Sequence, residues 1–300
     1  MHLLKSISDA IYDNEYPRDV LGIICEYVPH KQRIFCGYDY SVAMKDDGTL
    51  HSWGYDNFCQ VSKGSGFVSV SLGEWNSVAL KNDRTLQSWG NDENGQVSDT
   101  PKGSEFIQIS AGGSHSVALK DDGTVHSWGS DYYGQISETP KGSEFIEVSA
   151  GRCHSVALKD DGTLHYWGRN ESGQVSNTPK WSGFTEVSVG GNYSVALKDD
   201  GTLHSWGRCI HGNVSDTPKG SGFAEVSVGG YYSVALKDDG TLHSWGDYDG
   251  NVSDTPKGSG FIEVSTGRSY SVALKDDGTI HSWGYDNYGQ VSDTPKSIYF

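Results

Sequence analysis

Histidine recurs at one position in six of seven near copies of a fourteen-residue stretch, such as "SVALKDDGTLHSWG" at residues 233–246. Imidazole nitrogens are common zinc ligands, so a repeated His raises the question of a metal site. Zinc needs its ligands about 2.1 Å from one point, whereas equivalent residues of neighbouring repeats diverge from one another. We therefore predict no metal and no cofactor, and assign structural roles to His51, His126, His165, His204, His243 and His281.

The "KDDG" segments and the remaining polar residues give no catalytic or calcium-binding pattern. Two adjacent acids followed by Gly do not supply the alternating oxygen ligands of a calcium loop. No Ser-His-acid spacing stands out from the repeats, and no glycine-rich phosphate motif precedes a helix. We predict that the protein is not an enzyme and has no catalytic residues.

Two segments differ from copy to copy, one just before "SVAL" and one just after "WG". They place Tyr, Trp and Arg among Asn, Ser and Gly, which is typical of protein-binding surfaces. The alternative is that these loops drift because nothing constrains them, although drift favours Gly, Ser, Asp and Lys over aromatic residues. We predict that they bind a partner protein through Tyr38, Tyr55, Phe58, Trp75, Tyr132, Tyr133, Arg152, Arg169, Arg208, Tyr231, Tyr248, Arg268, Tyr285 and Tyr288.

The repeat that must position these residues has a period of 36 to 39 residues. Residues 223–228, 232–237, 241–245 and 251–253 are short and rich in β-branched or aromatic side chains, which predicts four strands. The "DDG" between the second and third strands predicts a hairpin turn in which Gly240 has a positive φ. Each copy is therefore predicted to form a four-stranded antiparallel sheet.

Seven such sheets can bury both faces by packing radially around an axis. An open solenoid is the alternative, but its terminal repeats are atypical, and the seventh copy here is as regular as the central ones. We predict an all-β fold, a seven-bladed β-propeller over residues 31–300, with a short α-helical segment at residues 1–30. Gly229, Gly230 and their equivalents are expected near the axis, where the chains crowd and only small residues fit.

Antiparallel connectivity sorts the loops between two faces. Both variable segments emerge on one face, whereas the "KDDG" turns and the "SDTPKGSG" linkers emerge on the other. The uniform face carries thirteen Asp in its hairpin turns, and the variable face carries four of the seven Arg. Trp181, on the uniform face, is a second candidate contact.

The stretch "VGGYYSVALKDDGTLHSWG", followed by "GNVSDTP", resembles the RCC1 repeat over residues 32 to 300. The resemblance implies a seven-bladed propeller in which the residue directly before "SVAL" is structural. The short blades are more similar to compact bacterial propellers that inhibit β-lactamase by binding it than to the chromatin-associated exchange factor. That factor implies an alternative function, guanine-nucleotide exchange on a small GTPase, but its wedge from one blade has no counterpart in these minimal copies.

The first thirty residues contain apolar side chains at helical spacing and predict two helices. "PRDVLGIICEYV", at residues 17–28, resembles the opening helix of an F-box, which implies a second alternative function as a ubiquitin-ligase adaptor. The other interpretation is that two helices simply pack against the propeller. An F-box-like start joined to near-identical tandem copies is also similar to proteins of giant DNA viruses.

Composition limits the partners further. The net charge is −16, with 39 acids and 23 bases, which argues against direct nucleic-acid binding because counterion displacement needs Lys and Arg. No apolar run approaches the ~20 residues of a membrane helix, and no secretion signal is recognisable. Five scattered Cys favour a reducing compartment, so we expect the protein in the cytoplasm or nucleus. We also expect it to be a monomer.

Overall fold

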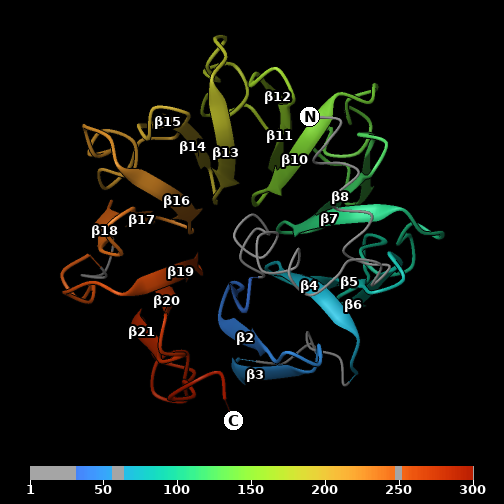
Figure 1. The fold of residues 1–300 in the computed structure, drawn as a ribbon. Coiled ribbons are helices and arrows are strands. Elements are labelled where there is room, and N and C mark those ends of the chain that lie inside the picture. Colours follow the sequence, from blue (N-terminus) through green and yellow to red (C-terminus); the bar gives the residue numbers. More distant parts are fainter. Residues whose placement is uncertain (1–31, 56–63, 247–251, 300) are drawn as a thin grey trace, which may run out of the picture. The chain divides into compact units, whose positions relative to one another are not determined.

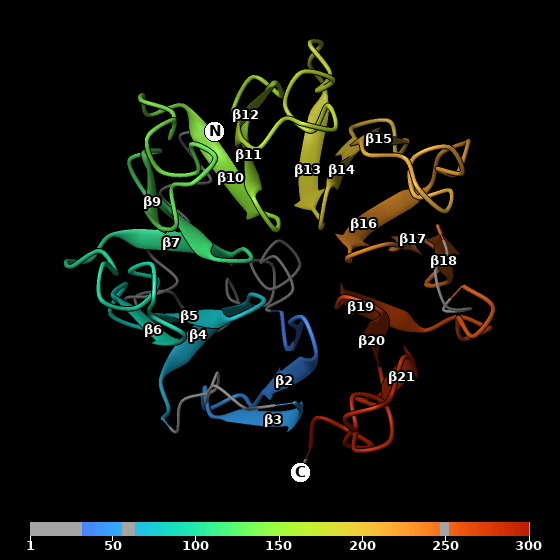
Figure 2. The same ribbon diagram turned by 180° about the vertical axis from the view of Figure 1, so that it is seen from behind.

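The computed structural model describes residues 32–55, 64–246 and 252–299. Within these ranges the chain forms seven three-stranded antiparallel sheets, and no helix there is long and apolar enough to cross a membrane. Residues 33–300 form one unit in which the sheets stand radially around an axis, as Figures 1 and 2 show from its two sides. The strands are β1 (Ile34–Cys36), β2 (Tyr40–Met44), β3 (Leu50–Gly54), β4 (Phe67–Leu72), β5 (Asn76–Lys81), β6 (Leu86–Gly90), β7 (Phe106–Ala111), β8 (His115–Lys120), β9 (Val125–Gly129), β10 (Phe145–Ala150), β11 (His154–Lys159), β12 (Leu164–Gly168), β13 (Phe184–Val189), β14 (Tyr193–Lys198), β15 (Leu203–Gly207), β16 (Phe223–Val228), β17 (Ser233–Lys237), β18 (Leu242–Trp245), β19 (Phe261–Thr266), β20 (Tyr270–Lys275) and β21 (Ile280–Gly284).

Each sheet, which we call a blade and number 1 to 7 in chain order, repeats one pairing scheme. In blade 6, β17 pairs with β16 on one side and β18 on the other. The hairpin between β17 and β18 is fixed by Asp239, whose Oδ1 accepts hydrogen bonds from Thr241 N and Oγ1 at 3.0 and 2.6 Å. Gly240 has a φ of +74°, as the "DDG" turn predicts. The first three predicted strands and their hairpin are confirmed.

The predicted fourth strand is wrong, because the segment after "WG" folds into consecutive turns in the described residues. In blade 2, Asp92 Oδ1 accepts hydrogen bonds from Val97 N and Ser98 N at 2.8 and 2.9 Å. Asp99 N donates to Gly95 O at 3.2 Å. These N–H groups are satisfied locally, so they are not free to form a ladder with β6. The blades therefore have three strands rather than four.

Tryptophan fills the space between neighbouring blades. Trp245 of blade 6 packs in a cluster with Val195 and Leu197 of blade 5, and its indole N–H donates to Asn213 O at 3.2 Å. Trp167 likewise donates to Gln135 O of the preceding blade at 2.8 Å. The repeated tryptophans are thus buried in the core, where the indole N–H of these two is satisfied.

The repeated histidines lie in six of the seven blades, one in each, and contact aromatic rings. His126 meets the Phe106 ring edge-on at 5.8 Å between centroids, and His243 meets Phe223 in the same way at 6.1 Å. The described ranges contain no group of three or more His, Cys, Asp or Glu that could hold a metal ion.

Seven backbone hydrogen bonds close the ring around the axis, each from one blade to the next. The donor–acceptor pairs are Tyr38–Gly73, Glu74–Gly112, Gly113–Gly151, Arg152–Gly190, Gly191–Gly229, Gly230–Arg268 and Arg268–Tyr38, at 3.2 to 3.4 Å. The last pair joins blade 7 to blade 1, and Ile34 N also donates to Glu263 Oε1 at 2.8 Å across that junction. The radial arrangement is therefore closed, and the open solenoid is excluded.

A second ring of side-chain hydrogen bonds runs through the residue directly before "SVAL". It consists of Tyr40–Ser77, Asn76–Ser116, His115–Ser155, His154–Ser194, Tyr193–Ser233, Tyr232–Ser271 and Tyr270–Ser41. All seven side chains before "SVAL" are buried, so this position is structural, as the resemblance implied. The predicted helices of residues 1–30 lie outside the described residues.

Candidate interaction face

The two variable loops of each blade are hydrogen bonded to each other. Tyr55 N donates to Asp39 O and Arg169 N donates to Cys153 O, both at 2.9 Å. At the opposite end of the blade, the hairpin turn bonds to the linker, with Asp121 N donating to Glu105 O at 2.9 Å. The two variable loops thus share one face of the ring, which we call the loop face.

In each blade, the loop between the first and second strands lies nearest the axis. Two adjacent positions in this loop, such as those of Gly190 and Gly191, have different surroundings. A Cβ added to Gly190 would lie 2.2 Å from Gly229 O of the next blade, so the first position is closed to any side chain. The second position borders an axial pocket of about 110 Å³ and accepts large side chains in four blades. The expectation that both positions must be small is therefore wrong for the second, which is occupied by Tyr38, Glu74, Gly113, Arg152, Gly191, Gly230 and Arg268.

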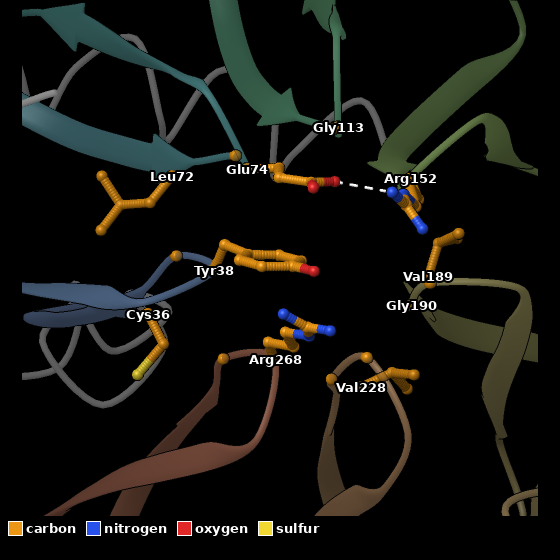
Figure 3. A pocket seen from close by; sticks show the side chains of 18 of the residues that line it. Cys36, Tyr38, Leu72, Glu74, Gly113, Arg152, Val189, Gly190, Val228 and Arg268 are labelled. Atoms are coloured by element: carbon orange, nitrogen blue, oxygen red, sulfur yellow. Dashed lines mark ion pairs between the residues drawn. The ribbon is translucent and has the colours of Figure 1, made fainter. Parts of the chain in front are cut away.

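The axial pocket contains two arginines, a buried carboxylate and a phenol (Figure 3). Arg152 Nε lies 3.2 Å from Glu74 Oε2, although these residues belong to blades 4 and 2. Gly113 of blade 3 stands between them and has no side chain to keep them apart. The Glu74 side chain is only 7% exposed. Burial raises the pKa of Glu74, and the Arg152 and Arg268 guanidinium groups oppose that rise.

Arg268 is held by aromatic rings. Its guanidinium carbon lies 4.4 Å from the Tyr38 ring centroid and 5.8 Å from that of Tyr231, within the range of a cation–π contact. Burial and the nearby Glu74 raise the pKa of Tyr38 to about 12, so its phenol stays neutral. Figure 3 shows the Arg268 guanidinium group beside the Tyr38 ring in the pocket.

A groove of about 260 Å³ adjoins the axial pocket and is lined by residues from blades 1, 2 and 7. Tyr38 stacks on Trp75 at 6.4 Å between centroids, and Tyr55 contacts Tyr288 at 4.6 Å. Trp75 is 37% exposed and Tyr288 is 47% exposed, so both rings present apolar surface to solvent at one groove. Tyr285 extends the same aromatic row beside Tyr288.

Seven stretches of the chain match the family described as Regulator of chromosome condensation (RCC1) repeat: residues 32–60, 67–96, 106–135, 145–174, 184–208, 223–251 and 261–290. The chain belongs to the RCC1 repeat family. Each match contains all three strands of one blade, so the structural unit and the RCC1 repeat coincide. No curated protein matches the sequence.

Solved structures share the RCC1 propeller fold. The ectodomain of the Arabidopsis thaliana receptor kinase ACR4 is 21% identical with a TM-score of 0.75, covering 89% of this chain and 98% of its own. The ectodomain of the Physcomitrella patens receptor kinase CR4 is 19% identical with a TM-score of 0.73, covering 84% and 73%. Prp20p of Saccharomyces cerevisiae is 18% identical with a TM-score of 0.65, covering 81% and 83%.

The RCC1 repeats bring together most of the predicted partner-binding residues, but in two separate clusters. The larger one is the pocket and groove described above. The smaller one joins Tyr132, Tyr133 and Arg169, with the Arg169 guanidinium 5.0 Å from the Tyr133 ring centroid. Arg169 also forms an ion pair with Glu171, which partly neutralises it.

Among the described residues, Arg208 lies apart from these clusters. The Arg208 side chain is exposed and has no ion pair or ring contact among the described residues. Phe58 and Tyr248 lie outside the described residues. The sequence prediction also omitted Glu74, which occupies the same repeat position as Arg152 and Arg268. That shared position was the available signal, since residues at one repeat position must face the axis together.

Proposed function

We propose that this RCC1-repeat propeller is a non-enzymatic interaction module that binds a partner protein through its loop face. The observation that carries the proposal is that aromatic and arginine side chains gather around one pocket and groove on a ring of otherwise uniform repeats. The uniform parts of the repeats indicate a shared structural role, whereas the variable loops are free to provide binding specificity. Prp20p, which has this fold, is described as binding Gsp1p and histones, and supports a protein-binding role.

The chemistry of the loop face fits recognition of a protein surface. Half-exposed aromatic rings such as Trp75 and Tyr288 offer large contact area with little conformational entropy to lose. Arginine beside aromatic rings is typical of residues that dominate binding energy. Ring closure by fourteen inter-blade hydrogen bonds around the axis holds these groups in place before binding, which lowers the ordering cost.

Affinity capture with the full chain tests the proposal. The quadruple variant Trp75→Ala, Arg152→Ala, Arg208→Ala and Tyr231→Ala should lose the proteins captured by the unmodified chain. A matched variant of the uniform face, with the exposed Lys102, Lys141 and Lys219 changed to Ala, should retain them. Circular dichroism checks that both variants fold. Equal recovery of the same proteins by all three forms would show that the loop face is not the binding surface.

A further inference from the structure

The axial pocket contains an arginine, Arg268, whose guanidinium group has no carboxylate partner among the residues that the structure describes. Among the described residues, no Asp or Glu oxygen lies within 4 Å of the Arg268 guanidinium, although Asp39 and Glu74 are near enough to influence neighbouring charges. Its position is instead fixed by stacking on the Tyr38 ring and by a side-chain interaction with Tyr231. An arginine that is oriented by stacking keeps most of its N–H donors for another group.

Arg152 contributes donors to the same opening. Its Nε is engaged by Glu74, yet its side chain remains 52% exposed. Figure 3 shows the Arg152 and Arg268 guanidinium groups at the rim of one pocket. Two guanidinium groups and one carboxylate line the axial pocket, so its lining has a local excess of one positive charge, while Asp39 lies in the adjoining groove and acts on Arg268 from there. The whole chain has a net charge of −16, so an anion is attracted here and repelled by most of the remaining surface.

We propose that this pocket binds a glutamate side chain presented by the partner protein, an inference that rests on the proposed function. A planar carboxylate matches the guanidinium fork through two parallel hydrogen bonds. The same pocket is also lined by Leu72, Val189 and Val228, which suit the short aliphatic stem of a glutamate. Gly191 and Gly230 leave their side of the rim free of side chains, so an extended peptide has room to enter. Inorganic phosphate has no aliphatic stem to contact these apolar side chains, which favours glutamate over phosphate.

Arginine-selective NMR of the full chain tests this proposal, because the chain has seven arginines whose Nε–Hε signals can be assigned by single substitutions. The probe is a doubly capped peptide, Gly-Gly-Glu-Gly-Gly, titrated through the millimolar range. The Arg268 and Arg152 signals should shift and saturate, while those of Arg84 and Arg169 should not. The peptide with Gln in place of Glu should cause no saturable shift. Arg268→Lys, which keeps the charge but loses the fork, should weaken binding by about tenfold.

Several outcomes would overturn the proposal. One is the absence of saturation at Arg268, and another is an equal shift of all exposed arginines. Saturation by inorganic phosphate but not by the Glu peptide would assign a different anion. Tighter binding of free glutarate than of the capped peptide would assign a small acid rather than a partner side chain. If the pocket fails these tests while the quadruple variant still loses its captured proteins, the inference is wrong and the proposed function stands.

Discussion

At the residue scale, two neighbouring glycines in one loop have different roles. The Cβ of an alanine at Gly190 would meet Gly229 O at 2.2 Å, whereas at Gly191 the nearest atom is 3.0 Å away. We expect Gly190→Ala to destabilise the protein by about 1–3 kcal/mol, the usual cost of overpacking. Gly191→Ala should have a much smaller effect, since its repeat position holds Arg152 in blade 4. Urea unfolding measures both, and equal losses would contradict this assignment.

A buried histidine at the inner ring predicts acid sensitivity. Burial, aided by nearby His115, lowers the pKa of His154 from 6.5 to about 3. The unfolded chain therefore binds a proton that the folded chain excludes, and stability is lost as the pH falls below about 6.5. By pH 5 this cost is about 2 kcal/mol for one such group. Tyr193, which fills the same position in blade 5, bonds to Ser233 and does not titrate in this range.

The substitution His154→Tyr tests whether His154 causes this loss of stability at acid pH. Near pH 7 the variant should be about as stable as the unmodified chain, and at pH 5 it should be more stable. Thermal unfolding at both pH values measures the difference. The same loss on acidification in both proteins would show that His154 is not the responsible group.

At the element scale, the innermost strands are connected by side chains that accept backbone N–H groups. Gln108 Oε1 of β7 accepts from Val148 N at 2.8 Å, and Glu147 Oε1 of β10 accepts from Val187 N at 3.2 Å. This arrangement satisfies the strand edge that faces the neighbouring blade. Gln and Glu thus perform the same structural task in adjacent blades.

The charge of that glutamate predicts a second pH dependence, opposite in sign to that of His154. Burial raises the pKa of Glu147 from 4.5 to about 8. The folded chain therefore holds a proton that the unfolded chain releases, and stability falls as the pH rises from about 4.5 through 8. Glu147→Gln should remove this loss and be more stable than the unmodified chain at pH 9 by at least about 1.4 kcal/mol, the equivalent of one pKa unit.

The exposed Glu93→Gln is the matched control, since it changes the same chemical group on a surface turn. Denaturant unfolding at pH 5 and pH 9 compares the two variants. Stabilisation of both variants at pH 9 would indicate a general effect of the chain's negative charge rather than burial of Glu147.

At the scale of the whole molecule, the ring closes without exchanging strands between its ends. Blade 1 and blade 7 each consist of strands consecutive in sequence, and their junction depends on hydrogen bonds and packing. Tyr270 OH donates to Tyr40 O at 2.6 Å and accepts from Ser41 Oγ at 3.0 Å. The residues nearest the C-terminus pair with the hairpin of blade 7, through Thr279 and Ser297.

A closed ring predicts that the terminal junction contributes as much as an internal one. Tyr270→Phe and the internal counterpart Tyr193→Phe should each lower the free energy of unfolding by about 1 kcal/mol, the net value of a typical hydrogen bond. Denaturant unfolding measures both. A loss for Tyr193→Phe with none for Tyr270→Phe would mean that the ring is open in solution.

The sequence by itself determined the number of blades, their first three strands, the tryptophan core and the face on which the variable loops lie. These features depend on local periodicity and on connectivity, which repetition makes visible seven times. The prediction from the sequence failed at the fourth strand, because Asp92 and its equivalents accept hydrogen bonds from nearby backbone N–H groups and hold the segment in turns. The strand propensities of the residues do not include this competition between side-chain hydrogen bonds and strand pairing.

Only the tertiary structure decided which variable residues meet. Ring closure places Arg268 of the last repeat on Tyr38 of the first. The missing side chain at Gly113 lets Glu74 reach Arg152 across a whole blade. Both contacts depend on the angle between blades and on the direction of side chains at the axis. Those quantities arise from the packing of all seven blades together, so no single repeat specifies them.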